Sequence, residues 1–192
     1  MTVKKDDRRV RYTKMALKET LVQLLEQKTI DRITIKELCE VADVNRSTFY
    51  AHYSDQYDLL RQIEQEILQE INEKLSAFNF KMFGPESALV INQIFEYVRE
   101  NAHLCRVLLG ENGDTALQQG LMAIIHEYTM KEWPGQTGLD QDTGQYLRLY
   151  AVNGCLGIVQ EWIRTGMGRS TSELADLVIK MTYSGLSAFT QD

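Results

Sequence analysis

Apolar residues recur along this chain at spacings of three and four, the pattern of one buried face on an α-helix. A helix of this kind is expected after a cap at Ser54 or Asp55. Its buried face is the series Leu60, Ile63, Ile67, Ile71 and Leu75. Prolines, which interrupt helices, occur only at Pro85 and Pro134. The pattern therefore predicts an all-α protein.

Helices in the rest of the chain are expected from the same spacing, with glycines between them. A Ser-x-x-Glu sequence at Ser170 and Glu173 is a capping box and opens the last helix. The expected ranges are about 13–27, 86–100, 102–109, 114–132, 140–165 and 172–189.

A second capping box marks the start of a short helix. Thr34 and Glu37 have the spacing in which the hydroxyl accepts from one free backbone N–H and the carboxylate accepts from another. This helix should run to about Val41. A tight turn follows, in which Asp43 is a residue that tolerates a left-handed backbone.

Another short helix is expected directly after this turn, from Arg46 to about His52, with Asn45 as its N-cap. A capped helix, a three-residue turn and a second capped helix within 20 residues have the size of a DNA-reading helix–turn–helix. We assign this motif to Thr34–Tyr53.

The second helix of the motif has an outer face with the chemistry of DNA contacts. Arg46, Ser47 and Tyr50 share this face by their spacing, and Arg46 can pair with the edge of a guanine. Tyr50, Thr48 and His52 can reach phosphates. The inner face and its expected partners are Phe49, Tyr53, Leu38, Val41 and Val44.

Charge is distributed unevenly. The net charge is −6, yet residues 1–53 hold 11 Lys and Arg against 8 Asp and Glu, whereas residues 54–192 hold 10 against 19. Residues 1–18 alone carry seven bases and two acids. A basic N-terminal part followed by an acidic remainder indicates that only the N-terminal part binds a polyanion.

The three cysteines stand far apart and are odd in number, which argues against a disulfide framework and fits a reducing compartment. Each cysteine has two interpretations: a small buried apolar residue, or a redox-sensing thiol. No apolar run approaches the roughly 18 residues of a membrane span, and no apolar segment follows the basic start. We expect a cytoplasmic protein without a secretory signal.

The motif and its flanks resemble the N-terminal domain of the TetR family of bacterial regulators over roughly residues 10–65. The similar segments are Ile33–Leu38, Ala42–Tyr53 and Tyr57–Leu60. More loosely, the second half resembles the C-terminal domains of a subset of that family. The segments concerned are Leu108–Gly113 and Asn153–Trp162.

This resemblance implies a two-domain, all-helical homodimer, with residues 1–54 binding DNA and residues 55–192 serving dimerisation and ligand binding. It implies a DNA-contacting arm, in the minor groove or on phosphates, formed by Arg8, Arg9 and Arg11. The DNA contacts implied in the motif are Thr34, Lys36, Asn45, Arg46, Ser47, Thr48, Tyr50, His52 and Gln56. Two residues depart from the family pattern: Asp43 replaces a usual glycine, and Gln56 a frequent lysine.

Small residues line one face of two expected C-terminal helices: Ala151, Gly154, Gly157, Ser184, Gly185 and Ala188. A glycine inside a helix costs roughly 1 kcal/mol relative to alanine, so two in one helix need a reason. We interpret them as a four-helix dimer contact, two helices from each subunit. Tight packing inside one subunit is the alternative.

An effector pocket in the C-terminal domain is common in the family. The candidate residues that would line it are Phe95, Val98, Leu104, Leu121, Ile125, Tyr128, Tyr146, Tyr150 and Trp162. The alternative for each of them is an ordinary place in the hydrophobic core. His103 and His126 lack metal-ligand spacing, and we expect no metal and no cofactor.

We predict a sequence-specific DNA-binding regulator, a repressor that a small-molecule effector releases from a palindromic operator. The alternative is a TetR-like coactivator that acts through a protein partner, such as a dihydroxyacetone kinase system, rather than DNA. An enzyme is not expected, since no Ser/His/Asp order, phosphate loop or His-Glu-x-x-His sequence occurs.

Overall fold

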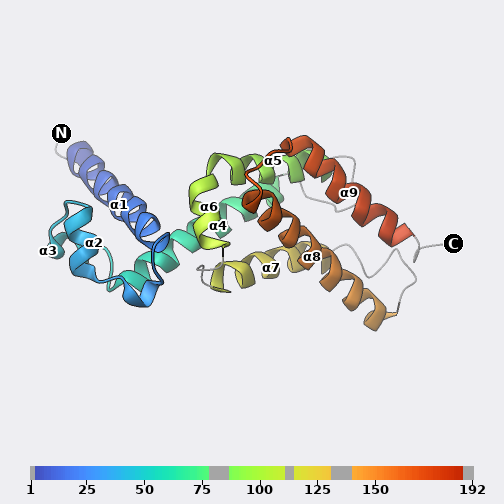
Figure 1. The fold of residues 1–192 in the computed structure, drawn as a ribbon, viewed down its shortest axis with the longest axis horizontal. Coiled ribbons are helices and arrows are strands. Elements are labelled where there is room, and N and C mark those ends of the chain that lie inside the picture. The colour runs from blue at the N-terminus through green and yellow to red at the C-terminus, as the bar shows by residue number, and fades with distance from the viewer. Residues whose placement is uncertain (1–2, 78–86, 111–114, 131–139, 188–192) are drawn as a thin grey trace. The chain divides into compact units, whose positions relative to one another are not determined.

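A computed structural model of the chain describes residues 3–77, 87–110, 115–130 and 140–187, and every regular element in these ranges is a helix (Figure 1). The expected all-α fold is confirmed. The helices are α1 (Val3–Leu25), η1 (Ile30–Arg32), α2 (Ile35–Val41), α3 (Arg46–Tyr50), α4 (Gln56–Ala77), α5 (Ser87–Glu100), α6 (Ala102–Leu108), α7 (Thr115–Met130), α8 (Gln141–Arg164) and α9 (Thr171–Ser187).

The chain divides into two compact units. The first unit contains Met1–Ile67 and Val107–Asp114, and the second contains Leu68–Arg106 and Thr115–Asp192. The division falls inside α4, so this one helix contributes its first turns to the first unit and its last turns to the second. The boundary expected between residues 54 and 55 stays a prediction.

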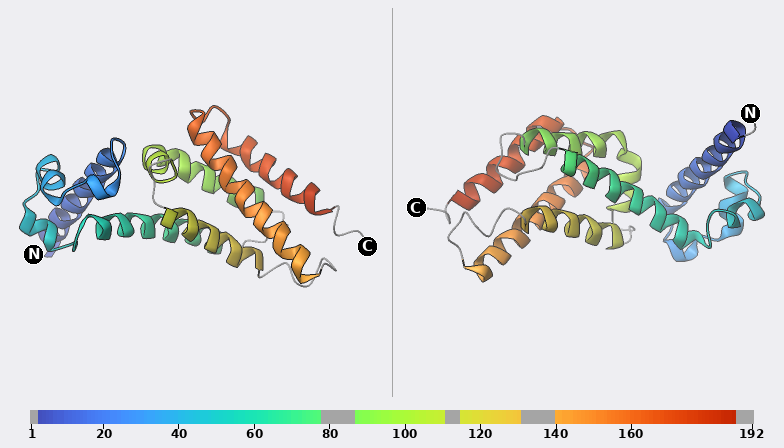
Figure 2. Two further views of the ribbon diagram at one scale, coloured as in Figure 1. Left: turned by 60° about the horizontal axis from the view of Figure 1, so that its bottom comes forward. Right: turned by 180° about the vertical axis from the view of Figure 1, so that it is seen from behind.

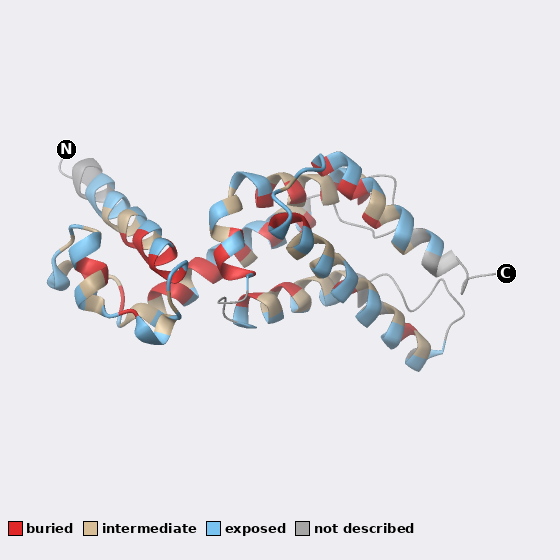
Figure 3. Cartoon of the chain, in the orientation of Figure 1, coloured by how far each residue is buried: buried red, intermediate tan, exposed pale blue. Residues whose placement is uncertain are grey.

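The core of the first unit is formed by the apolar faces of its helices (Figure 3). Leu17 and Leu21 of α1 are fully buried, and α1 packs against α2 through this side. The helix expected over residues 13–27 therefore exists, but it begins ten residues earlier, at Val3, and ends at Leu25. Its extra turns lie ahead of the first buried leucine.

The start of α4 is capped by two aspartates. Asp55 Oδ1 accepts a hydrogen bond from the backbone N–H of Asp58 at 2.7 Å, and Asp58 Oδ2 accepts one from the N–H of Ser54 at 2.9 Å. This reciprocal pair satisfies N–H groups that a helix start leaves without partners, and it identifies Asp55 as the cap. The expected apolar series from Leu60 to Leu75 is buried throughout.

In the second unit, α9 packs along α5, and α7 packs against α8 (Figures 1 and 2). Phe95 and Trp162 meet edge to face with ring centroids 5.4 Å apart. The hydroxyl of Thr171, buried at the start of α9, donates to a carboxylate oxygen of Glu96 on α5. The five helices expected in this half agree with the observed bounds to within about two residues.

The connection from α8 to α9 is a Schellman-type turn. Gly166, at φ 80°, donates its backbone N–H to the carbonyl of Ile163 at 3.2 Å. The N–H of Met167 bonds to the carbonyl of Trp162 at 2.9 Å. The indole of Trp162 also donates to the carbonyl of Arg169 at 3.0 Å, which fastens the loop to the end of α8.

The predicted capping box before α9 is complete. The N–H of Ser170 donates to Glu173 Oε2 at 3.0 Å, and the N–H of Glu173 donates to Ser170 Oγ at 3.3 Å. The hydrogen bonds that the Glu173 carboxylate accepts from Ser170, above all the one from the Ser170 N–H, lower the pKa of Glu173. The sequence signal and the observed helix start therefore agree.

Candidate nucleic-acid interface

The helix–turn–helix begins at Thr34, as predicted. Its backbone is extended, at φ −100° and ψ 148°, and its hydroxyl accepts from the N–H of Glu37 at 3.2 Å. The second half of the predicted capping box is different. The carboxylate of Glu37 accepts from Lys28 Nζ at 2.5 Å, and this bond lowers the pKa of Glu37. The backbone of Thr34 also lowers this pKa, as the capping box predicts, but less than Lys28 does.

The turn between α2 and α3 has a left-handed residue at its centre. Asp43 has φ 52°, which confirms the expectation from its type. The N–H of Val44 donates to the carbonyl of Cys39 at 3.0 Å, and that of Ala42 to Leu38 at 3.0 Å. These bonds close the end of α2 and redirect the chain into the next helix.

Asn45 caps α3, as predicted. Its Oδ1 accepts from the N–H of Ser47 at 3.0 Å and from the hydroxyl of Ser47 at 3.1 Å. The helix is shorter than expected: it covers Arg46–Tyr50, and a turn carries the chain on to Tyr53, whose N–H donates to the carbonyl of Phe49 at 3.0 Å.

The inner side of the motif's second helix is formed by two aromatic rings, Phe49 of α3 and Tyr53 just after it. Phe49 and Tyr53 are almost fully buried, with ring centroids 5.6 Å apart, and Leu38 is buried in the same unit. Val44 is half-buried. The expectation for Val41 is wrong: as the last residue of α2 it is 51% exposed, because its position turns its side chain toward solvent.

The outer face of α3 is accessible. Arg46, Ser47 and Tyr50 are exposed, Tyr50 by 58%, while Thr48 and His52 are half-buried. Hydrogen-bonding groups of three kinds therefore reach solvent from one short helix. The remaining predicted contacts in the motif are Thr34, Lys36 and Asn45, which are exposed, and Gln56, which is half-buried.

The negative net charge of the helix–turn–helix was not predicted from the sequence. Lys36 lies 3.9 Å from the carboxylate of Glu40, and no ion pair of Arg46 occurs within the described residues. Residues 34–53 contain two cations, Lys36 and Arg46, against three carboxylates, which makes −1 with neutral histidine. A count over the motif itself, instead of over residues 1–53, would have found this.

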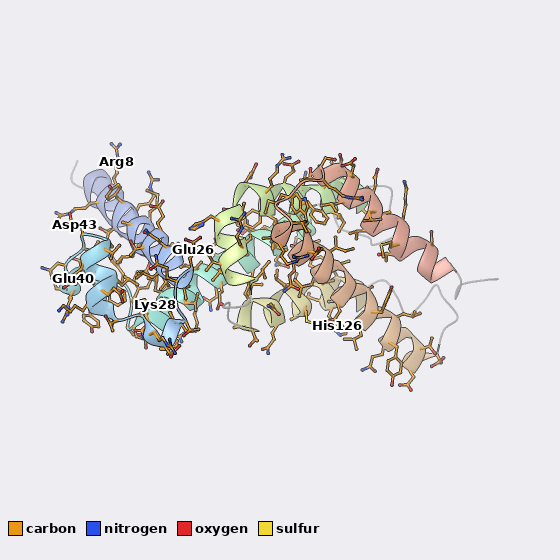
Figure 4. The ribbon with its side chains drawn as sticks, viewed as in Figure 1. Arg8, Glu26, Lys28, Glu40, Asp43 and His126 are labelled. Atoms are coloured by element: carbon orange, nitrogen blue, oxygen red, sulfur yellow. The ribbon has the colours of Figure 1, made fainter. Side chains whose placement is uncertain are left out.

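The three arginines expected in an arm lie on a helix instead. Arg8, Arg9 and Arg11 are exposed on the first turns of α1, and Figure 4 shows Arg8 pointing away from the rest of its unit. Helical spacing had been expected only from Thr13 onward, since the polar residues before it show no apolar periodicity.

The residues predicted to line an effector pocket differ in how far they are exposed. Phe95 and Trp162 touch each other in the core. Tyr146 and Tyr150 point outward from α8, 69% and 74% exposed, so within one chain they line no interior. The others lie on three helices: Val98, Leu104, Leu121, Ile125 and Tyr128, of which Val98 and Leu121 are buried and the rest half-buried.

The small-residue face of α8 is open. Gly154 and Gly157 are exposed, and a Cβ on either would meet no heavy atom within 4 Å, so tight packing inside one subunit does not explain them. Ala151 is half-buried and Ser184 exposed. Gly185 lies in α9, and Ala188 lies outside the described residues.

Other chemistry is sparse in the described part of the chain. No group of three His, Cys, Asp or Glu side chains there could hold a metal ion, and no helix there has the length and apolarity to cross a membrane. Burial raises the pKa of the Cys105 and Cys155 thiols to about 11, so little reactive thiolate forms at neutral pH.

Comparisons with known proteins agree with this arrangement. A family model described as "Transcriptional regulator C-terminal region", of the TetR type, matches residues 86–184, just over half of the chain. The chain is 24% identical over 176 residues to YxbF of Bacillus subtilis (strain 168), an uncharacterized HTH-type transcriptional regulator. That match covers 84% of this chain but only 42% of the length of YxbF.

Two solved structures have the same fold. A TetR transcriptional regulator from Streptococcus agalactiae 2603V superposes with a TM-score of 0.68 at 17% identity, over 94% of this chain and 99% of that one. FadR from Bacillus subtilis, in complex with stearoyl-CoA, has a TM-score of 0.62 at 18% identity, over 89% and 98%.

A capped helix–turn–helix joined by a long helix to a helical C-terminal unit defines a transcription regulator of the helix–turn–helix class. The chain belongs to the TetR family of transcriptional regulators.

Proposed function

We propose that this chain is a sequence-specific DNA-binding regulator that acts as a homodimer on palindromic DNA. The observation that carries this proposal is the two-sided α3. Phe49 of α3 and Tyr53, three residues after its end, anchor it in the first unit, while Arg46, Ser47 and Tyr50 face solvent. This is what a helix needs if it is to enter the major groove, which is about 12 Å wide.

Each exposed group has a role in this proposal. Arg46 forms two hydrogen bonds with a guanine edge, since guanidinium geometry fits its O6 and N7 acceptors. Ser47 and Asn45 lie beside it at the start of α3. Phosphates are held by Thr34 and Lys36 near the start of α2 and by further contacts at Thr48, Tyr50, His52 and Gln56.

A second copy of the chain covers the open face of α8. This face carries Gly154 and Gly157, and Tyr150 and Tyr146 extend it by one and two turns toward the helix start. Exposed aromatic rings next to glycines suit a helix–helix contact, because the glycines allow close approach and the rings fill the flanks. Members of the family act as dimers. Two-fold symmetry then places two α3 helices on half-sites roughly 34–36 Å apart.

The regulator is a repressor that an effector releases, and the effector binds in the second unit. The aromatic core around Phe95 and Trp162 supports this proposal, as does the fold shared with FadR, whose structure holds stearoyl-CoA. Such an effector acts by favouring one separation of the two α3 helices over another.

The proposal is tested by selecting duplexes from a random pool with the full-length protein and measuring affinity for selected and scrambled duplexes. Arg46→Ala should cost about 1–3 kcal/mol on the selected duplex and relax the preference at one base position. Arg106→Ala removes an exposed arginine from α6 and should change neither.

Selection of no preferred duplex would contradict the proposal. It would favour instead the alternative of a coactivator that works through a protein partner. An Arg46→Ala variant that binds all duplexes as the unaltered protein does would exclude the assigned role of α3.

A further inference from the structure

The first turns of α1 are a basic, exposed extension of the helix. Residues 8–12 are all exposed, and from Arg8 onward Leu17 is the first buried residue of α1 (Figure 3). Arg8 lies near the outer end and points into solvent (Figure 4). These turns therefore add little to the core of their unit, and their charges need another explanation.

The cations on α1 form a stripe along one face. Arg8, Arg11, Lys14 and Lys18 are spaced by three, three and four residues, so they follow one another along the helix surface. At 1.5 Å per residue the stripe is about 15 Å long. Lys18, at its inner end, is ion-paired with Glu66 of α4. The described residues place no carboxylate within 4.0 Å of the other three.

The helix–turn–helix does not supply the positive charge that DNA binding requires. Its residues 34–53 carry a net charge of −1, and Lys36 already has Glu40 beside it. Sequence-independent affinity for DNA comes almost entirely from cations that neutralise phosphates. Within residues 1–53 the largest group of such cations is on α1, where residues 1–18 hold seven bases against two acids.

We propose that the first turns of α1 bind the phosphate backbone of DNA as a helix, outside the grooves, and supply most of the electrostatic part of the affinity. This inference rests on the proposed DNA binding by α3. An α-helix with its side chains is about 10–12 Å across. The minor groove is about 6 Å wide, so α1 does not enter it while helical, and α3 occupies the major groove.

This placement has a definite consequence for recognition. Arg8, Arg11 and Lys14 contact phosphates, which position a protein but carry no base sequence. The segment thus strengthens binding to every duplex by the same factor. An extended arm that read the minor groove would instead favour particular sequences.

The test measures fluorescence anisotropy of the full-length protein over a salt series, with the selected duplex and a scrambled duplex of equal length. The variant is Arg8→Gln with Arg11→Gln. Arg106→Gln with Arg169→Gln is the control, since it removes two exposed arginines of the second unit for the same change in net charge.

The α1 variant should weaken binding to both duplexes by the same factor, of the order of tenfold, and reduce the slope of log affinity against log salt by about two per subunit. The control should change neither quantity. An unchanged salt slope would overturn the proposal, and so would a loss confined to the selected duplex, because that loss would mean base reading.

A second pair of variants tests the helix itself. Val10→Pro interrupts α1 without removing a charge, and Val10→Ala preserves it. Only the proline variant should weaken binding to both duplexes. Equal affinities of the two variants would contradict binding as a helix.

The two proposals fail in different ways. If the unaltered protein prefers a duplex and the α1 variants bind it unchanged, only the α1 inference is wrong. If it binds all duplexes equally but loses affinity in the α1 variants, sequence-specific function is wrong and the phosphate contact stands. If it binds no duplex, both are wrong.

Discussion

Lys28 Nζ lies 2.5 Å from Glu37 Oε1 and joins the segment before η1 to the first turn of α2. The hydrogen bond from Lys28 lowers the pKa of Glu37 below its ordinary value of 4.5. The pair therefore stabilises the fold above the unfolded-state pKa and loses this contribution as pH falls through the lower folded-state pKa.

Glu37→Gln should remove this acid dependence. Chemical unfolding monitored by circular dichroism across the acidic range would measure it, with Glu19→Gln at an exposed position of α1 as the comparison. If Glu37→Gln and the unaltered protein lose stability in parallel as pH falls, the ion pair does not contribute.

Tyr53→Phe should stabilise the first unit by about 1 kcal/mol, because an unsatisfied buried hydroxyl loses its hydration without a compensating bond. Within the described residues the Tyr53 hydroxyl is buried and has no hydrogen-bond partner, and desolvation raises its pKa to about 12. Urea unfolding gives the change directly. Tyr57→Phe, at an exposed position, should have almost no effect, and a less stable Tyr53→Phe would reveal a hidden partner.

Asp43→Gly should stabilise the motif by about 1 kcal/mol, since a left-handed backbone costs an L-residue roughly that amount. It also removes a negative charge from a motif of net charge −1, so affinity should rise for every duplex. Asp43→Asn separates the two effects: it removes the charge while keeping a residue that tolerates this backbone. Thermal unfolding and DNA titration of both variants test this, and a fall in affinity would refute it.

Gly157→Leu should abolish dimerisation without unfolding the chain. A Cβ at Gly157 would meet nothing within 4 Å in its own subunit, yet a side chain there would stand between two closely packed helices in the proposed dimer. Analytical ultracentrifugation measures the association state, and circular dichroism reports the fold. Ala123→Leu, at an exposed position of α7, adds a leucine away from this face and should leave the dimer intact. A dimeric Gly157→Leu would place the interface elsewhere.

The helix starts could be predicted because their signals are local. Thr34, Asn45 and Ser170 each cap a helix through a hydrogen bond to a residue two or three positions away, so residue type and spacing are sufficient. The left-handed backbone at Asp43 could also be predicted locally, since the tolerance for this conformation is a property of the aspartate itself.

Predictions that depended on distant partners were less successful. Glu37 has the spacing for a bond to the backbone of Thr34, but the hydrogen bond that most lowers its pKa comes from Lys28, nine residues away. Periodicity also does not report which side of α8 is covered, so Tyr146 and Tyr150 were placed in a pocket although they are exposed. Both outcomes depend on which surfaces the folded chain brings together.

The sequence by itself determined the all-α class, the bounds of most helices and the position of the DNA-reading motif, because capping and periodicity act over a few residues. Tertiary structure decided which helix faces stay open. Gly154 and Gly157 face empty space, and the arginines of α1 stand exposed on a continuous helix. Burial depends on packing between distant segments, which local patterns do not encode.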